Sequence, residues 1–393
     1  MKKQKMTSTQ VIILGILSAF GPLALDLYLP GLPVLQKELH TTAAMTQLSI
    51  TATMFGLAIG QVLIGPLSDR IGRKKPLLIG IIAFTLASFG IAVSDNIQWL
   101  IFLRLIQGLG GATGIVLSLA IITDSFEGIQ LTKNVAINQT INGIFPILAP
   151  VLGGILIAIA DWRSTFWLLA GLGAILVVAI FFKLPETKQK VEHVTMKDTL
   201  SSFKHVFTNR FFMTMTLVQA LMMGALFAYI AGSSFVLQDM FGVSVPEFSA
   251  IYAFNGFGIL LGASISGKMA EKHAPQAILK RFMAVSVLGG LLLLTTLFLP
   301  KSLLLVSFAF FLIVAPIGGI SSMTTAIAMA HEHRDSGTAS GILGLTRYAM
   351  GGIMSPIVGL GGTTTMVPLV LTILAVQFIG SAIFMLTQKR LAG

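Results

Sequence analysis

Three formally charged side chains lie inside long apolar stretches of this 393-residue sequence: Asp26, Arg104 and Arg347. A charge in an apolar environment is costly, so such residues are candidates for proton or ion movement. Burial favours the protonated form of Asp26, whereas a nearby arginine favours its carboxylate. A contact between Asp26 and Arg104 that opens and closes would therefore load and release a proton.

The helical rise per residue predicts that Asp26 and Arg104 lie at a similar depth, each about 20 Å from the cytoplasmic side. They could therefore pair. The alternative is a static salt bridge that only fixes the positions of two helices. We favour proton coupling because no other carboxylate lies so deep. Arg347 could contact a bound anionic group, Asp26 or backbone carbonyls, and the alternative is a structural arginine that reaches toward water.

Other polar side chains within the apolar stretches could line a central cavity. This group comprises Tyr28, Gln107, Asn138, Asn142, Gln219, Tyr229 and Asn255, together with Arg347. For each of them, the alternative is a hydrogen bond that joins neighbouring helices.

Nothing in the sequence indicates an enzyme. The chain has no cysteine, which excludes thiolate chemistry, and no nucleophile and base pair or His-Glu-x-x-His motif is recognisable. We interpret His331–His333 as a solvated helix end. The glycines of residues 104–114 superficially resemble a phosphate-binding loop, but they lie inside an apolar run, so we expect close helix packing. The sequence predicts no catalytic residue, cofactor, metal or nucleic-acid partner. The expected coupling ion is the proton.

The elements that carry these residues are apolar segments of membrane-spanning length. The chain is 55% hydrophobic and 10% charged, whereas soluble domains carry about a quarter charged residues. A span needs about 20 apolar residues. This composition excludes a soluble enzyme and a disordered chain, and it predicts an all-α integral membrane protein. We expect twelve transmembrane helices, at residues 10–31, 43–66, 76–94, 98–122, 134–160, 164–184, 210–236, 247–268, 277–299, 302–330, 337–360 and 366–387.

The sequence also predicts two halves and an orientation. The polar stretch 185–209 is interpreted as a cytoplasmic linker between six-helix halves at 1–184 and 210–393. The glycine spacing of the first half, at Gly56, Gly60 and Gly65, recurs 202 residues later, as in internally repeated transporters. If both termini are cytoplasmic, 21 of the 26 basic residues lie inside. This bias follows the positive-inside rule and explains the net charge of +11.

Several motifs carry a resemblance to a known family. The stretch GPLSDRIGRKKPLLIG at 65–80 resembles the signature loop of the major facilitator superfamily. The pattern Arg104, Gln107, Gly108 resembles its second motif, and NGIFPILAPVLGG at 142–154 resembles its antiporter motif, although Ala149 stands where many antiporters have glycine. Together with ALDLYLPGLP at 24–33, the chain is similar to twelve-span drug:proton antiporters of the bicyclomycin and chloramphenicol resistance (Bcr/CflA) branch.

The resemblance implies roles for particular residues. Asp26 and Arg104 would take part in proton coupling. Asp69, Arg70 and Arg73 would form a cytoplasmic charge network that holds the two halves together in the outward-open state. We also expect Asp69 to lie near a helix N-terminus, where the helix dipole favours a negative charge. The residues implied in conformational gating are Gly65, Asp69, Arg70, Gly72, Arg73, Pro146, Pro150, Gly153 and Gly154.

The expected function is proton-coupled export of small hydrophobic or amphipathic toxic compounds by alternating access. The expected location is a bacterial plasma membrane, with lipid and the small-molecule drug as partners and the monomer as the working unit. Two alternatives stay open, an exporter of a specific metabolite such as an amino acid or sugar, and a non-transporting membrane sensor or a channel.

Overall fold

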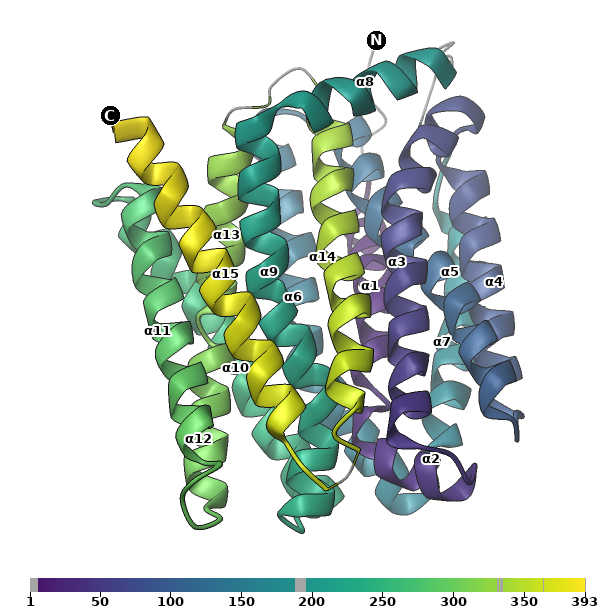
Figure 1. The fold of residues 1–393 in the computed structure, drawn as a ribbon. Helices are drawn as coiled ribbons and strands as arrows, with labels where there is room; N and C mark the ends of the chain where they lie inside the picture. The colour runs from purple at the N-terminus through teal and green to yellow at the C-terminus, as the bar shows by residue number, and fades with distance from the viewer. Residues whose placement is uncertain (1–5, 188–195, 331, 333–334, 363, 393) are drawn as a thin grey trace. The chain divides into compact units, whose positions relative to one another are not determined.

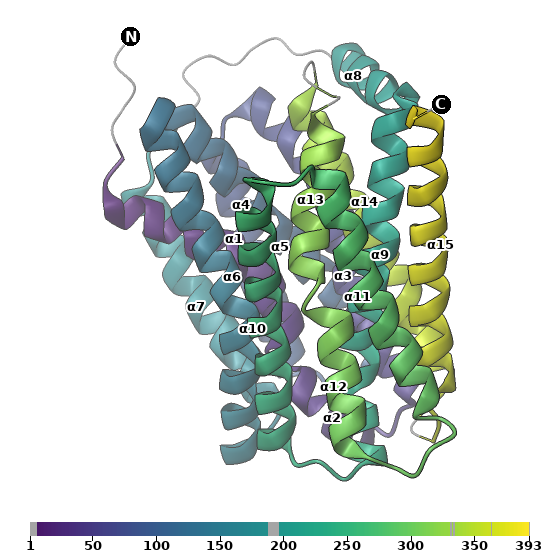
Figure 2. The ribbon, with the colours of Figure 1, turned by 90° about the vertical axis from the view of Figure 1, so that its left-hand side faces the viewer.

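The computed structural model describes residues 6–187, 196–330, 332, 335–362 and 364–392, and within these ranges it contains helices and no strand. Figures 1 and 2 show the helices from two sides. In chain order they are α1 (Ser8–Asp26), η1 (Leu29–Gly31), α2 (Leu32–Glu38), α3 (Ala43–Ile71), α4 (Lys74–Ala92), α5 (Ile97–Ser125), α6 (Gly128–Ile159), α7 (Arg163–Lys183), α8 (Met196–Thr208), α9 (Arg210–Ser234), η2 (Phe235–Met240), α10 (Val245–Ala270), α11 (Pro275–Thr295), α12 (Leu303–Val314), α13 (Ile317–Met329), α14 (Ser336–Gly359) and α15 (Val367–Ala392).

The prediction of an all-helical membrane protein is confirmed. Among the described residues, eleven helical segments are long and apolar enough to cross a membrane. The predicted span 337–360 corresponds to α14, which is 24 residues long and is not one of the eleven. Its sequence is rich in glycine, serine and threonine and contains Arg347, which lowers its mean hydropathy.

Three segments differ from the predicted spans. The first apolar segment is broken, because α1 ends at Asp26 and is followed by the short helices η1 and α2. The segment 302–330 is divided between α12 and α13 just before Pro316, whose ring removes a backbone donor. The stretch 185–209, interpreted as a cytoplasmic linker, contains the amphipathic helix α8.

The chain divides into two compact units. The first comprises residues up to Gly31 and Ala52–Leu200, so it contains α1, most of α3, and α4 to α7. Within it α1 packs between α5 and α6, and α4 packs between α5 and α7. Glycines permit this close approach, since a Cβ atom added at Gly114 of α5 or Gly153 of α6 would collide with the backbone of α1 at Leu17 or Leu27. The packing role predicted for the glycines of residues 104–114 is confirmed.

The second unit comprises Leu32–Thr51 and Ser201–Gly393. Its central helix is α9, which packs against α13, α14 and α15 (Figure 1). The other helices, α10 to α12, pack against one another and α13 (Figure 2). The first turns of α3 belong to this unit through Gln47, whose Nε2 donates to the Ala231 carbonyl at 3.1 Å and whose own carbonyl accepts from Ser355 Oγ at 3.3 Å.

Candidate functional site

The first unit buries one arginine completely. Arg104 lies on α5 and is 0% exposed. Its Nη1 donates to the main-chain carbonyl of Ala24 on α1 at 2.9 Å and to the side-chain oxygen of Gln107. Gln107 in turn donates to Ser88 Oγ on α4 at 2.7 Å. These bonds form a chain of polar groups that joins three helices within an apolar core.

Two aromatic rings cover the rest of the Arg104 guanidinium. Its Cζ atom lies 4.3 Å from the ring centroid of Tyr28 and 5.5 Å from that of Phe166. Two of its nitrogens, Nε and Nη2, are buried and have no hydrogen-bond acceptor among the described residues. The electron-rich faces of the rings offset part of the cost of burying the cation. Arg104 therefore keeps donor capacity that a further anionic group could use.

Asp26 lies where α1 ends. Its side chain is buried, at 7% exposure, and it stands two residues after Ala24, which accepts the hydrogen bond from Arg104. That bond joins Arg104 to the turn of α1 that also carries Asp26. Their direct pairing stays a prediction, because the acceptors identified for Arg104 Nη1 are Ala24 and Gln107.

Other predicted cavity residues of the first unit form bonds between α1 and α6. The Asn142 Nδ2 group donates to Ser18 Oγ on α1 at 2.5 Å and to the Asn138 carbonyl one helical turn earlier at 3.1 Å. Ser18 Oγ lies 3.4 Å from Asn138 Oδ1. In this structure both asparagines therefore take part in helix packing, which was the alternative considered for them.

The predicted cavity residues of the second unit also bond neighbouring helices. Gln219 on α9 donates to Thr325 Oγ1 on α13 at 2.9 Å. Asn255 on α10 donates to the Tyr229 hydroxyl on α9 at 2.8 Å, and the Tyr229 ring stacks against Tyr252 at a centroid distance of 5.4 Å. Gln219, Tyr229, Tyr252 and Asn255 are buried, and Thr325 is partly exposed.

Arg347 has a different environment from Arg104. It lies on α14 at intermediate exposure, and its Cζ atom is 5.0 Å from the ring centroid of its neighbour Tyr348. Its buried Nε has no hydrogen-bond acceptor among the described residues. Both alternatives for Arg347, an anionic ligand and a structural role, stay open.

Charged residues near the end of the second predicted span meet around Arg73, while the predicted role of such a network in holding the two halves together stays a prediction. The Arg73 guanidinium contacts Asp69 at 2.9 Å and Asp124 at 2.8 Å, and it donates to Ser68 Oγ at 2.7 Å. Burial disfavours the charged guanidinium, but the hydrogen bond and charge of Asp124, with those of Asp69, raise the pKa of Arg73 above its ordinary value. These contacts all lie within the first unit.

A backbone feature completes this network. Gly72 adopts a left-handed conformation with φ of 89°, and a Cβ atom there would collide with the Glu186 carboxylate. That carboxylate accepts hydrogen bonds from the amides of Arg73 at 2.8 Å and Lys74 at 3.0 Å, which begin α4. Gly72 is therefore required both for the turn and for the approach of Glu186.

Other gating residues have simpler surroundings. Arg70 is partly buried at the end of α3, and its Nε has no hydrogen-bond acceptor in the described chain. Space is open around Gly65. Pro146 and Pro150 lie inside the continuous helix α6, and Gly154, beside the close contact at Gly153, is buried.

Asp69 lies in the last turn of α3 and contacts Arg73, and the predicted effect of a helix dipole on its charge stays a prediction. One sequence-based interpretation was wrong. Glu332, interpreted as part of a solvated helix end, is only 2% exposed; the neighbours His331 and His333 lie outside the described residues. Sequence reasoning also missed Asp124, Glu186, Ser88 and Phe166, which are distant in sequence from the motifs they support.

Comparisons with known proteins agree with this fold. Residues 14–356 match the family model described as Major Facilitator Superfamily. The chain is 35% identical to "Uncharacterized MFS-type transporter YdgK" of Bacillus subtilis (strain 168), over 96% of this chain and 95% of that protein. It is 28% identical to "Bicyclomycin resistance protein homolog" of Haemophilus influenzae, over 100% and 99% of the two chains. It is 29% identical to "Chloramphenicol resistance protein" of Pseudomonas aeruginosa, over 73% and 68%.

A solved structure has the same fold. A bacterial homologue of the human lysosomal transporter Spinster, in an inward-facing and occupied conformation, matches with a TM-score of 0.75 over 97% of both chains, at 15% sequence identity. This likeness shows the fold, and the family match with the named relatives decides the class of protein. The chain belongs to the Major Facilitator Superfamily and is a multi-pass membrane transporter, not an enzyme.

Proposed function

We propose that this transporter is a drug:proton antiporter that exports small hydrophobic or amphipathic toxic compounds across a bacterial plasma membrane. The full-length similarity to a bicyclomycin resistance protein homologue supports the substrate class. The similarity to a chloramphenicol resistance protein and to multidrug resistance proteins named MdtL, over 59% or more of this chain, supports it further.

The observation that carries proton coupling is the surroundings of Arg104. One nitrogen of this completely buried guanidinium is bonded to Ala24 on α1, and two others have no acceptor in the described chain. The buried carboxylate of Asp26 lies two residues after Ala24. Burial favours the neutral acid, and a cation favours the carboxylate. A small change in the distance between Asp26 and Arg104 would therefore change the proton occupancy of Asp26.

Coupling to drug export needs two conformations with different proton affinity. In alternating access, residues 1–184 and 210–393 move as two bodies. The break after Asp26 supports such a motion, because the carboxylate lies at a joint between α1 and η1 and not inside a rigid helix. Protonation would shift the equilibrium only by the difference in proton affinity between the two conformations. Proton and drug therefore need not occupy the same atoms.

The experiment that tests this function is transport by the purified chain in proteoliposomes with an imposed pH gradient. The panel would contain neutral chloramphenicol and bicyclomycin, a lipophilic cation such as ethidium, an anionic dye, and amino acids and sugars. We expect gradient-driven movement of the neutral or cationic toxic compounds. Movement of only an amino acid or a sugar would instead support a metabolite exporter, and no response to any compound or gradient would support a sensor.

A further inference from the structure

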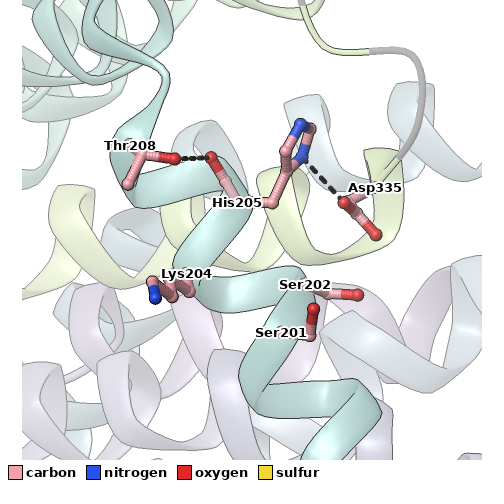
Figure 3. A pocket seen from close by; sticks show the side chains of 6 residues that line it. All are labelled: Ser201, Ser202, Lys204, His205, Thr208 and Asp335. Atoms are coloured by element: carbon pink, nitrogen blue, oxygen red, sulfur yellow. Dashed lines mark hydrogen bonds and ion pairs between the residues drawn. The ribbon is translucent and has the colours of Figure 1, made fainter.

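Three potential metal ligands converge in the second unit. His205 comes from α8, and Glu332 and Asp335 come from the segment that joins α13 to α14. One ligand atom from each residue lies within 4.8 Å of the other two. His205 Nδ1 is 2.9 Å from Asp335 Oδ2 and 3.6 Å from Glu332 Oε1. Figure 3 shows the imidazole of His205 turned toward Asp335.

These separations match the edges of a metal coordination shell. Zinc binds histidine nitrogen and carboxylate oxygen at about 2.0 to 2.2 Å in a tetrahedral arrangement, which places ligand atoms about 3.3 Å from one another. The observed values of 2.9 and 3.6 Å lie on either side of that distance. The three donors are therefore arranged so that a small adjustment could admit one ion between them.

The surroundings of Glu332 hold its carboxylate in place. Asn209 Nδ2 donates to Glu332 Oε2 at 3.1 Å. Asn209 is itself fixed, because its Oδ1 accepts from the Phe212 amide at the start of α9. The other oxygen, Oε1, accepts from the Asp335 amide at 3.4 Å and lies 3.6 Å from His205 Nδ1. Outer-shell bonds of this kind orient ligands in metal sites.

The site is also accessible and has a suitable charge. The His205 side chain is 42% exposed, and with Asp335 it lines a hollow of about 250 Å³ together with Ser201, Ser202, Lys204 and Thr208. A neutral imidazole and two carboxylates carry a net charge of −2, which a divalent cation would offset. Lys204 opposes this effect. An ordinary ion pair with protonated His205 is the competing explanation.

We propose that His205, Glu332 and Asp335 form a divalent cation site, with zinc as the ion that fits best. One imidazole and two carboxylates leave a fourth zinc position for water. Occupancy would tie α8 to the segment that precedes α14. This would make the attachment of the later part of α8, within the polar stretch 185–209, to the rest of the second unit dependent on metal. Zinc binding is independent of proton coupling and can be measured without transport.

The test is a zinc titration of the purified full chain, without a polyhistidine tag, in competition with a chromogenic chelator. The absence of cysteine removes background binding by thiols. We expect one competing site per chain, weakened at least about tenfold by His205→Ala and by Glu332→Gln, as is typical of changes near a metal. The matched control is His273→Ala, an exposed histidine in the turn after α10, which we expect to bind zinc like the wild type.

Thermal unfolding distinguishes a lost site from a lost fold. We expect zinc to raise the melting temperature of the wild type and of His273→Ala, but not that of His205→Ala or Asp335→Asn. Equal zinc affinity in the wild type and His205→Ala would overturn the proposal. So would binding that is abolished by replacing His331 and His333 but is unaffected at His205, since the ion would then have other ligands.

Discussion

Arg104 Nη1 donates a 2.9 Å hydrogen bond to the main-chain carbonyl of Ala24, two residues before the buried Asp26. A side chain on α5 is thereby attached to the last turn of α1. The bond fixes the level at which the arginine meets α1 and leaves two of its nitrogens without an acceptor. Movement of α1 past α5 would change the surroundings of Asp26 and Arg104 together.

Arg104→Lys should abolish transport although it keeps the positive charge. A lysine cannot reproduce the planar fork that bonds Ala24 while it stacks on Tyr28 and Phe166. Leaving the Ala24 carbonyl unpaired would cost about 1 to 3 kcal/mol of stability. Drug uptake into everted vesicles at matched expression is the measurement. Arg163→Lys, at an arginine paired with the exposed Asp95, is the control, and normal transport by Arg104→Lys would refute this expectation.

Gly153→Ala should loosen the packing of α6 on α1. The added Cβ would overlap the carbonyl oxygen of Leu27, so the backbones must separate. Such overpacking costs about 1 to 3 kcal/mol. Thermal unfolding of the detergent-solubilised protein measures the loss. The control is Gly65→Ala, where space is open; equal melting temperatures for the two variants would contradict the expected clash.

Asp124→Asn should destabilise the first unit by an amount that does not depend on pH in the neutral range. The pKa of Arg73 is raised above its ordinary value in the folded protein, by Asp124 and Asp69 against the effect of burial. Its stabilisation is therefore complete below the unfolded pKa and is lost only as pH rises through the still higher folded pKa. The partly exposed pair contributes about 1 kcal/mol or less. Melting curves from about pH 6 to pH 9, where arginine stays charged, measure the difference. If the stability difference between the wild type and Asp124→Asn disappeared within this pH range, Arg73 could not be the partner through which Asp124 stabilises the fold.

Single cysteines can test the orientation cleanly, because the chain has none of its own. The excess of basic residues on one side predicts that the turn after α10 faces the cytoplasm and the turn after α4 faces the outside. In intact cells, a membrane-impermeant maleimide should therefore label Asp95→Cys and not Lys272→Cys, both at exposed positions. The reverse pattern would show that the termini lie outside.

The coarse fold was predictable from the sequence because lipid imposes strong constraints on composition. Apolar runs of about 20 residues can hardly be anything but spanning helices. The positions at which helices are interrupted were harder to predict. Helix α1 ends at Asp26 while the apolar run continues, so hydropathy alone carries no signal there. The helix α8 did leave a signal that was missed, since apolar residues recur along it with helical spacing at Leu200, Phe203 and Val206.

The candidate site was predictable only where charge made residues stand out. Asp26 and Arg104 are conspicuous because intramembrane charges are rare. The partners of Arg73 were not conspicuous in the sequence, because Asp124 is 51 residues away and reaches Arg73 only through tertiary packing. Nor could spacing show that Asn138 and Asn142 bond Ser18, since a polar residue in an apolar helix suits either a cavity or a neighbouring helix.

The most direct test of proton coupling is substrate-driven proton movement by Asp26→Asn in proteoliposomes, followed with an internal pH dye. Asp95→Asn, an exposed carboxylate paired with Arg163, is the control, and Asp26→Glu tests whether a carboxylic acid alone suffices. We expect Asp26→Asn to insert and bind substrate but to move no protons, while Asp95→Asn matches the wild type and Asp26→Glu keeps part of the activity. Full substrate-driven proton exchange by Asp26→Asn would contradict the assignment of Asp26 as the proton carrier.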